Sequence, residues 1–154
     1  MTLSESDFTS VVRNTPLVSI DLIICDPSGA VLMGWRNNEP AKDTWFVPGG
    51  RIRKDERIAA AFERIMATET GLQVPFRQAR FGSVYEHLYA ENCFGDPGFG
   101  THYCVLSYII ELDHQPAFRT DGQHSRFAWL TPSSSSAIHP YSRAYFDLLA
   151  SRRH

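Results

Sequence analysis

The chain of 154 residues lacks the features that mark membrane, nucleic-acid-binding or secreted proteins. No apolar run approaches the roughly 20 residues that a helix needs to cross a bilayer. Lys and Arg number 15 against 17 Asp and Glu, a formal charge of −2, whereas a nucleic-acid-binding surface is normally basic. The N-terminal stretch MTLSESDFTS is polar and has no secretory hydrophobic region. We therefore expect neither a membrane nor a nucleic-acid partner.

Cysteine is also scarce. Cys25, Cys93 and Cys104 are odd in number and lack the spacing of a metal site, so we expect reduced thiols and a cytoplasmic protein. Internal repeats are absent. With 43% hydrophobic residues, the length suits a single domain over residues 1–154 with a substantial core.

The apolar segments alternate with turn residues in a way that predicts an α/β fold. Leu17–Cys25 and 30–36 are rich in aliphatic residues and are separated by the turn DPSG, which predicts a hairpin. The other expected elements are strands at 45–47, 81–89, 101–112 and 126–130 and a closing helix at 141–152.

The segment 50–72, GRIRKDERIAAAFERIMATETGL, contains the most informative pattern. Ile58, Ala61, Phe62 and Ile65 recur at helical spacing and predict one apolar stripe, in which Glu69 lies one turn beyond Ile65. An inward carboxylate needs a partner, because an unpaired buried charge is costly. From geometry alone, Glu69 is equally well interpreted as a metal ligand or as a residue that caps the helix or pairs with an arginine.

The same segment resembles the signature of the Nudix family. Six residues are in register with it: Gly50, Glu56, Arg64, Glu69, Gly71 and Leu72. Ile65 and Thr68 stand where the signature has two further carboxylates. The resemblance implies the Nudix fold, a mixed β-sheet sandwiched between helices, with the Nudix box at 50–72. It also implies a diphosphate substrate, a divalent metal and altered chemistry, because only Glu69 remains of the carboxylate cluster.

Other segments resemble a narrower group, the GDP-mannose mannosyl hydrolases. They are DFTSVVRNTPLVSIDLII, PAKDTWFVPGGR, the THY at 101–103 and the DGQH at 121–124, and this group also lacks the two carboxylates. The resemblance implies a homodimeric enzyme that hydrolyses GDP-mannose or GDP-glucose. Mannose and glucose differ in the orientation of one hydroxyl, so both remain candidates.

The resemblance further implies one divalent ion held by the Gly49 carbonyl, the Glu69 carboxylate and the Gln123 side-chain amide. These oxygen ligands suit Mg²⁺, for which Mn²⁺ can substitute. One carboxylate neutralises half of the ion's charge, and the remainder can stabilise a departing diphosphate. His124 would be the general base, although spacing alone leaves His87 and His102 as alternatives.

The remaining site residues also rest mainly on the resemblance. Arg36, Arg51 and Tyr103 would meet the diphosphate, since guanidinium donors match phosphate oxygens. Asp21 is expected to partner a sugar hydroxyl or an arginine, and His87 is expected among the substrate-binding residues. Thr2, Leu3 and Phe8 resemble an N-terminal arm that contacts the nucleotide and is exchanged in the dimer, although Phe8 also suits core packing. Glu56 and Arg64 are expected to fasten loop to helix.

Two other functions remain open. A conventional Nudix pyrophosphohydrolase would attack phosphorus and would need replacement carboxylates, for which Glu86 and Glu91 are candidates. A non-catalytic nucleotide-sugar sensor would keep the pocket without turnover. The presence of both Gln123 and His124 argues against such a sensor.

Overall fold

A computed structural model of the chain describes residues 2–117 and 126–152. The elements are α1 (Glu5–Asn14), β1 (Leu17–Cys25), β2 (Val31–Trp35), β3 (Trp45–Phe46), β4 (Gly49–Arg51), α2 (Ile58–Thr70), the 3-10 helix η1 (Phe76–Gln78), β5 (Arg80–Tyr89), β6 (Thr101–Glu111), β7 (Phe127–Leu130) and α3 (Pro140–Ser151). The strands and the two helices expected from apolar periodicity are therefore present, with ends that shift by one or two residues.

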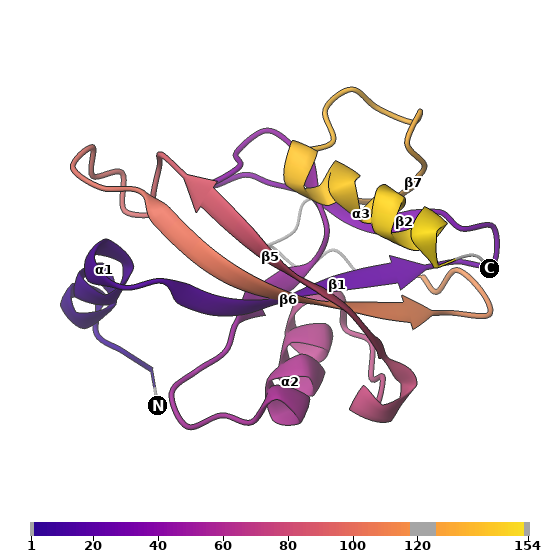
Figure 1. Cartoon of the computed structure of the whole chain (residues 1–154), viewed down its shortest axis with the longest axis horizontal. Helices are drawn as coiled ribbons and strands as arrows, with labels where there is room; N and C mark the ends of the chain where they lie inside the picture. Colours follow the sequence, from indigo (N-terminus) through magenta and orange to yellow (C-terminus); the bar gives the residue numbers. More distant parts are fainter. Residues whose placement is uncertain (1, 118–125, 153–154) are drawn as a thin grey trace.

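The strands form one mixed sheet with the order β3-β2-β1-β6-β5, to which β4 adds beside β1 and β7 beside β2. β1 lies at its centre: it runs parallel to β6 along its whole length, and its first half pairs antiparallel with β4. The expected hairpin between β1 and β2 is present but pairs only Cys25 with Val31. Figure 1 shows α2 on one face of the sheet and α3 on the other, which confirms the predicted sandwich.

The sheet separates two hydrophobic cores, and β1 contributes to both. Ile20, Leu22 and Ile24 pack on the α2 side, and Ile23 packs on the α3 side. A strand that is covered on both faces is expected to be apolar nearly throughout. Asp21, which lies on the α3 side, is the charged exception in this strand and directs attention to that face.

Helix α2 buries Ala61, Phe62 and Ile65 against the sheet. It ends at Gly71, whose φ of 75° is a left-handed conformation that glycine adopts without strain. One detail of the predicted stripe is wrong. Ile58 is 42% exposed, because it lies in the first turn of the helix, ahead of the turns that pack on the sheet. Glu69 is half-buried.

The N-terminal segment forms helix α1, which was not predicted from the sequence. The Ser4 hydroxyl caps the helix by accepting a hydrogen bond from the Asp7 amide at 3.1 Å. Val12 is its one buried residue, so apolar periodicity gives little signal there. Figure 1 places α1 beyond one end of the sheet, away from α2 and α3.

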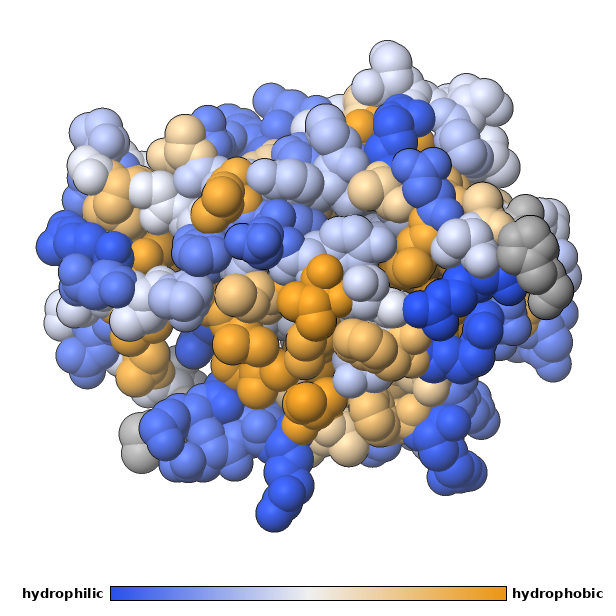
Figure 2. Space-filling model, viewed as in Figure 1, coloured by the Kyte–Doolittle hydropathy of each residue, from blue (hydrophilic) through white to orange (hydrophobic). Residues whose placement is uncertain are grey.

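Apolar side chains also reach the surface on the face shown in Figure 2. Among the described residues, the exposed large apolar side chains are Val18, Ile58, Phe81, Val84 and Leu88. Three of these belong to the edge strand β5. No helix in the described ranges has both the length and the apolar character required to cross a membrane.

Candidate functional site

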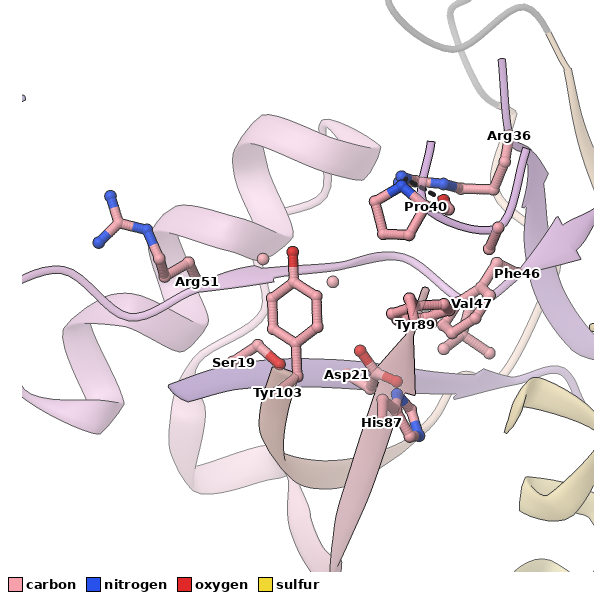
Figure 3. Close-up of a pocket in the computed structure, with 13 residues that line it drawn as sticks. Ser19, Asp21, Arg36, Pro40, Phe46, Val47, Arg51, His87, Tyr89 and Tyr103 are labelled. Carbon is pink, nitrogen blue, oxygen red and sulfur yellow. Dashed lines mark hydrogen bonds between the residues drawn. The ribbon is translucent and has the colours of Figure 1, made fainter. Parts of the chain in front are cut away.

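A cavity of about 110 Å³ lies on the α3 side of the sheet, where β1, β4, β5 and β6 meet (Figure 3). Its lining consists of Ser19, Asp21, Arg36, Pro40, Ala41, Phe46, Val47, Gly49, Gly50, Arg51, His87, Tyr89 and Tyr103. Six of the predicted site residues are thereby brought to one place, although they come from segments far apart in the sequence.

A second pocket adjoins the first and shares Arg36, Phe46, Val47 and Gly49 with it. Glu69 lines this second pocket. Two of the three predicted metal ligands, Gly49 and Glu69, therefore border the same space, and both offer oxygen donors. The third, Gln123, and the predicted base, His124, lie outside the described residues. Within those residues, no three His, Cys, Asp or Glu side chains gather into a metal-binding group, and the predicted ligand set requires only one such side chain.

Asp21 lies beneath the cavity, where it is only 6% exposed. One of its oxygens, Oδ2, accepts a hydrogen bond from the Tyr145 hydroxyl at 2.5 Å. Burial raises the pKa of Asp21 to about 7, and the Tyr145 hydrogen bond and the charge of Arg36 oppose that rise. The carboxyl group can thus both accept and donate a hydrogen bond near neutral pH, and its predicted contact with a sugar hydroxyl or an arginine stays a prediction.

His87 is the second buried polar group of the cavity, at 3% exposed. Its Nε2 atom has no hydrogen-bond partner among the described residues. Buried polar atoms almost always have a partner, so such an atom indicates where a ligand would supply one. Burial, together with the nearby His139, lowers the pKa of His87 to about 4, so the ring is neutral at physiological pH.

The two arginines lie on opposite sides of the cavity (Figure 3). Arg36 donates to the Pro40 carbonyl at 3.1 Å, whereas the Arg51 guanidinium lies over the Phe8 ring, 4.8 Å from its centre. In the part of the chain that the structure describes, neither forms an ion pair with a carboxylate. Both charges are therefore available to an anionic ligand.

The N-terminal residues lie apart from this cavity. Thr2, Leu3 and Phe8 line neither pocket. Phe8 packs edge-on against Phe94, with ring centres 5.6 Å apart, and lies under Arg51 of the same chain. The alternative interpretation of Phe8 as a packing residue therefore has direct geometric support, and its contact with a nucleotide stays a prediction.

Glu56 and Arg64 fasten the loop after β4 to helix α2, as predicted. Arg64 Nε donates to Glu56 Oε2 at 2.7 Å, and Arg64 Nη2 donates to the Arg51 carbonyl at 2.8 Å. The hydrogen bonds from Arg64 lower the pKa of Glu56 to about 2. This pair fixes the backbone that carries Arg51 beside the cavity.

Three tyrosines of the site were not predicted from the sequence: Tyr89, Tyr141 and Tyr145. Tyr89 lines the cavity beside His87, and the two-residue period of β5 already placed it on the same face. Tyr141 and Tyr145 lie behind the cavity on α3, and no local pattern indicates which strand residues that helix covers.

Comparison with known proteins agrees with this architecture. The NUDIX domain family matches residues 15–149. The chain belongs to the Nudix family. It is 35% identical over 147 residues to the low-salt glycan biosynthesis protein Agl8 of Haloferax volcanii, an alignment that covers 96% of this chain and 90% of that protein.

Solved Nudix structures share the fold at low sequence identity. The MutT NUDIX hydrolase from Burkholderia pseudomallei superposes with a TM-score of 0.72 at 20% identity, covering 88% of this chain and 99% of that one. The NUDIX domain of Shewanella oneidensis NrtR, solved with ADP ribose, gives a TM-score of 0.67 at 16% identity, covering 99% and 100%. At these identities the likeness establishes the Nudix hydrolase fold.

Proposed function

We propose that the protein is a Mg²⁺-dependent hydrolase of GDP-mannose or GDP-glucose that attacks the anomeric carbon and releases GDP and the free hexose. The observation that supports it is one cavity lined by Arg36 and Arg51, neither ion-paired within the described residues, and by the buried Asp21 and His87, whose Nε2 has no partner among those residues. The arginines suit a diphosphate, and Asp21 and His87 suit sugar hydroxyls.

Gly49, Glu69 and Gln123 would hold the metal ion, whose chemistry is to stabilise the negative charge on the departing diphosphate. Glu69 is the one carboxylate in this set. Such a site favours departure of the nucleotide over activation of water at phosphorus. We therefore expect cleavage between the sugar carbon and the phosphate oxygen, with inversion of the anomeric configuration.

His124 is proposed as the general base. The two alternatives are less suitable. The depressed pKa of His87 makes it a poor proton acceptor at neutral pH, and His102 lines neither site pocket. Bound water would be activated on the face of the sugar opposite the nucleotide, as inversion requires.

The position of the cleaved bond tests this function. Hydrolysis of GDP-mannose and GDP-glucose in ¹⁸O-labelled water should place the label in the hexose, with GDP as the nucleotide product. ADP-sugars and metal-free reactions serve as controls. Label in a nucleotide phosphate, or GMP as the main product, would instead establish the conventional pyrophosphohydrolase.

The conventional alternative requires replacement carboxylates. The two candidates for that role, Glu86 and Glu91, are exposed and line neither site pocket. The remaining alternative, a nucleotide-sugar sensor, would show tight GDP-mannose binding without hydrolysis at saturating Mg²⁺.

The roles of Glu69 and His124 should separate in kinetics. Glu69→Gln should weaken both Mg²⁺ binding and turnover, because it removes the site's only charged protein ligand. His124→Gln should lower kcat by about 10²- to 10⁴-fold, the usual contribution of a positioned base, and leave Mg²⁺ affinity unchanged. Titration of Mg²⁺ into each variant, followed by steady-state kinetics, checks both. Equal loss of Mg²⁺ affinity in the two variants would contradict this division.

A further inference from the structure

Helix α3 carries two tyrosines, Tyr141 and Tyr145, that lie one helical turn apart and share a face of the helix. Both contact buried polar groups of the cavity, yet neither lines the cavity itself. They are therefore placed behind the surface that a ligand would touch.

Tyr145 anchors Asp21. Its side chain is fully buried, with its ring edge-on to Tyr85 at 5.0 Å, so the hydroxyl has little freedom to move. The hydroxyl donates to Asp21 Oδ2 at 2.5 Å, which fixes the carboxyl plane. The other oxygen, Oδ1, faces Gly49: a Cβ atom at Gly49 would lie only 2.6 Å from it. One oxygen is thus held by α3 while the other borders the cavity.

Tyr141 anchors His87 in a different way. Its hydroxyl accepts from the Leu88 amide at 3.1 Å and donates to the Leu88 carbonyl at 2.8 Å, which ties α3 to β5 beside His87. Its ring stacks face to face on the imidazole, with centres 4.2 Å apart and planes parallel. Phe46 contacts the imidazole edge-on at 6.0 Å. These contacts fix the ring plane without satisfying Nε2.

We infer that Tyr141 and Tyr145 are positioning residues, which hold His87 and Asp21 in the orientation that receives the sugar of the substrate. This inference rests on the function proposed above. The two tyrosines act through Asp21 and His87, so they should influence the hexose half of a GDP-hexose and leave the GDP half unaffected. The arginines, which would meet the diphosphate, come from other elements.

Tyrosine-to-phenylalanine variants test the inference, because they remove one oxygen and keep the ring. Tyr145→Phe frees Asp21 and should lower kcat/KM for GDP-mannose by about 10- to 100-fold, the scale on which misplaced groups slow enzymes. Inhibition by GDP, which has no sugar to misplace, should stay within about twofold. Tyr141→Phe should act in the same direction with a smaller effect, because its stack on His87 remains.

Tyr108→Phe is the matched control. Tyr108 is also buried, but it lies in the α2-side core against Phe62 and Phe76, away from the cavity. It should keep both kcat/KM and GDP inhibition within about twofold of wild type. If Tyr145→Phe behaves like Tyr108→Phe, or loses GDP inhibition in proportion to turnover, the positioning role is overturned.

A measurement without ligand separates this inference from the proposed function. NMR spectra of the His87 ring should show one sharp set of signals in the wild type and exchange-broadened signals in Tyr141→Ala, which removes the stacked ring as well as the hydroxyl. A wild type with sharp signals that does not hydrolyse GDP-hexoses would refute the proposed function and support the positioning geometry. Broadened His87 signals in the wild type would refute the positioning role, whatever the substrate.

Discussion

His87 is deeply buried, its Nε2 has no hydrogen-bond partner among the described residues, and its burial sets the direction in which its pKa shifts. The pKa of about 4 lies below the ordinary 6.5, so the folded protein disfavours the charged ring. His87 therefore contributes to the free energy of unfolding above pH 6.5, and that contribution is lost as the pH falls towards 4. The His87 side chain should therefore make the free energy of unfolding sensitive to acid.

His87→Phe removes that titration and keeps an aromatic ring on Tyr141. We expect the melting temperature of the wild type, relative to the variant, to drop by several degrees between pH 7 and pH 4. Thermal unfolding in metal-free buffer across this range provides the measurement. If the difference in melting temperature between the two proteins does not change with pH, His87 is not the source of the acid-sensitive stability.

Neighbouring glycines of strand β4 differ in what surrounds them. A Cβ atom at Gly49 would lie 2.6 Å from both Asp21 Oδ1 and the Ile20 carbonyl, and that carbonyl is backbone that cannot easily move. At Gly50 the nearest atom is Ile65 Cγ1 at 3.1 Å, part of a side chain that can adjust. Gly49 thus lets β4 approach β1 closely on the cavity side, whereas Gly50 faces Ile65 of α2.

Gly49→Ala should therefore destabilise the protein by about 1 to 3 kcal/mol, the usual cost of overpacking, and Gly50→Ala by less. Chemical denaturation of both variants gives the comparison. Gly49→Ala should also weaken Mg²⁺ binding, because it displaces the carbonyl of the proposed metal site. If Gly50→Ala proves the more damaging of the two, the close approach at Gly49 is not what constrains β4.

Elements with a strong apolar pattern were predictable from the sequence, and elements without one were not. β1 was predicted with its observed ends because burial on both faces makes it continuously apolar. Helix α1 was missed because it buries only Val12. β4 was missed because glycines carry no side-chain signal and the strand exists through its pairing with β1.

The sequence predicted which residues line the site better than it predicted the contacts between them. The resemblance named Asp21, Arg36, Arg51, His87 and Tyr103, and all five line one cavity. The tyrosines of α3 could not be found, because the hydrogen bond between Tyr145 and Asp21 joins residues 124 positions apart. Contacts of that kind depend on which helix covers which face of the sheet.

At the scale of the whole molecule, the exposed apolar side chains of β5 bear on assembly. Val84 and Leu88 are 57% and 59% exposed, and Val18 of β1 is 45% exposed. Val84 and Leu88 occupy alternate positions of β5 that share one face, the face opposite His87. Large apolar side chains that are exposed on one face of a sheet are typical of protein–protein interfaces. These residues therefore favour the homodimer that the resemblance implies, which stays a prediction.

Light scattering at micromolar concentration should thus give twice the chain mass of 17.4 kDa. Replacing both Val84 and Leu88 with lysine should shift the protein towards the monomer, because like charges would face each other across a symmetric interface. Ile58→Lys, which alters an exposed apolar residue on α2, is the matched control and should remain dimeric. A wild type of 17.4 kDa throughout would show that the homodimer is wrong. A double variant that stays dimeric would place the interface elsewhere and favour exchange of the N-terminal arms that carry Phe8.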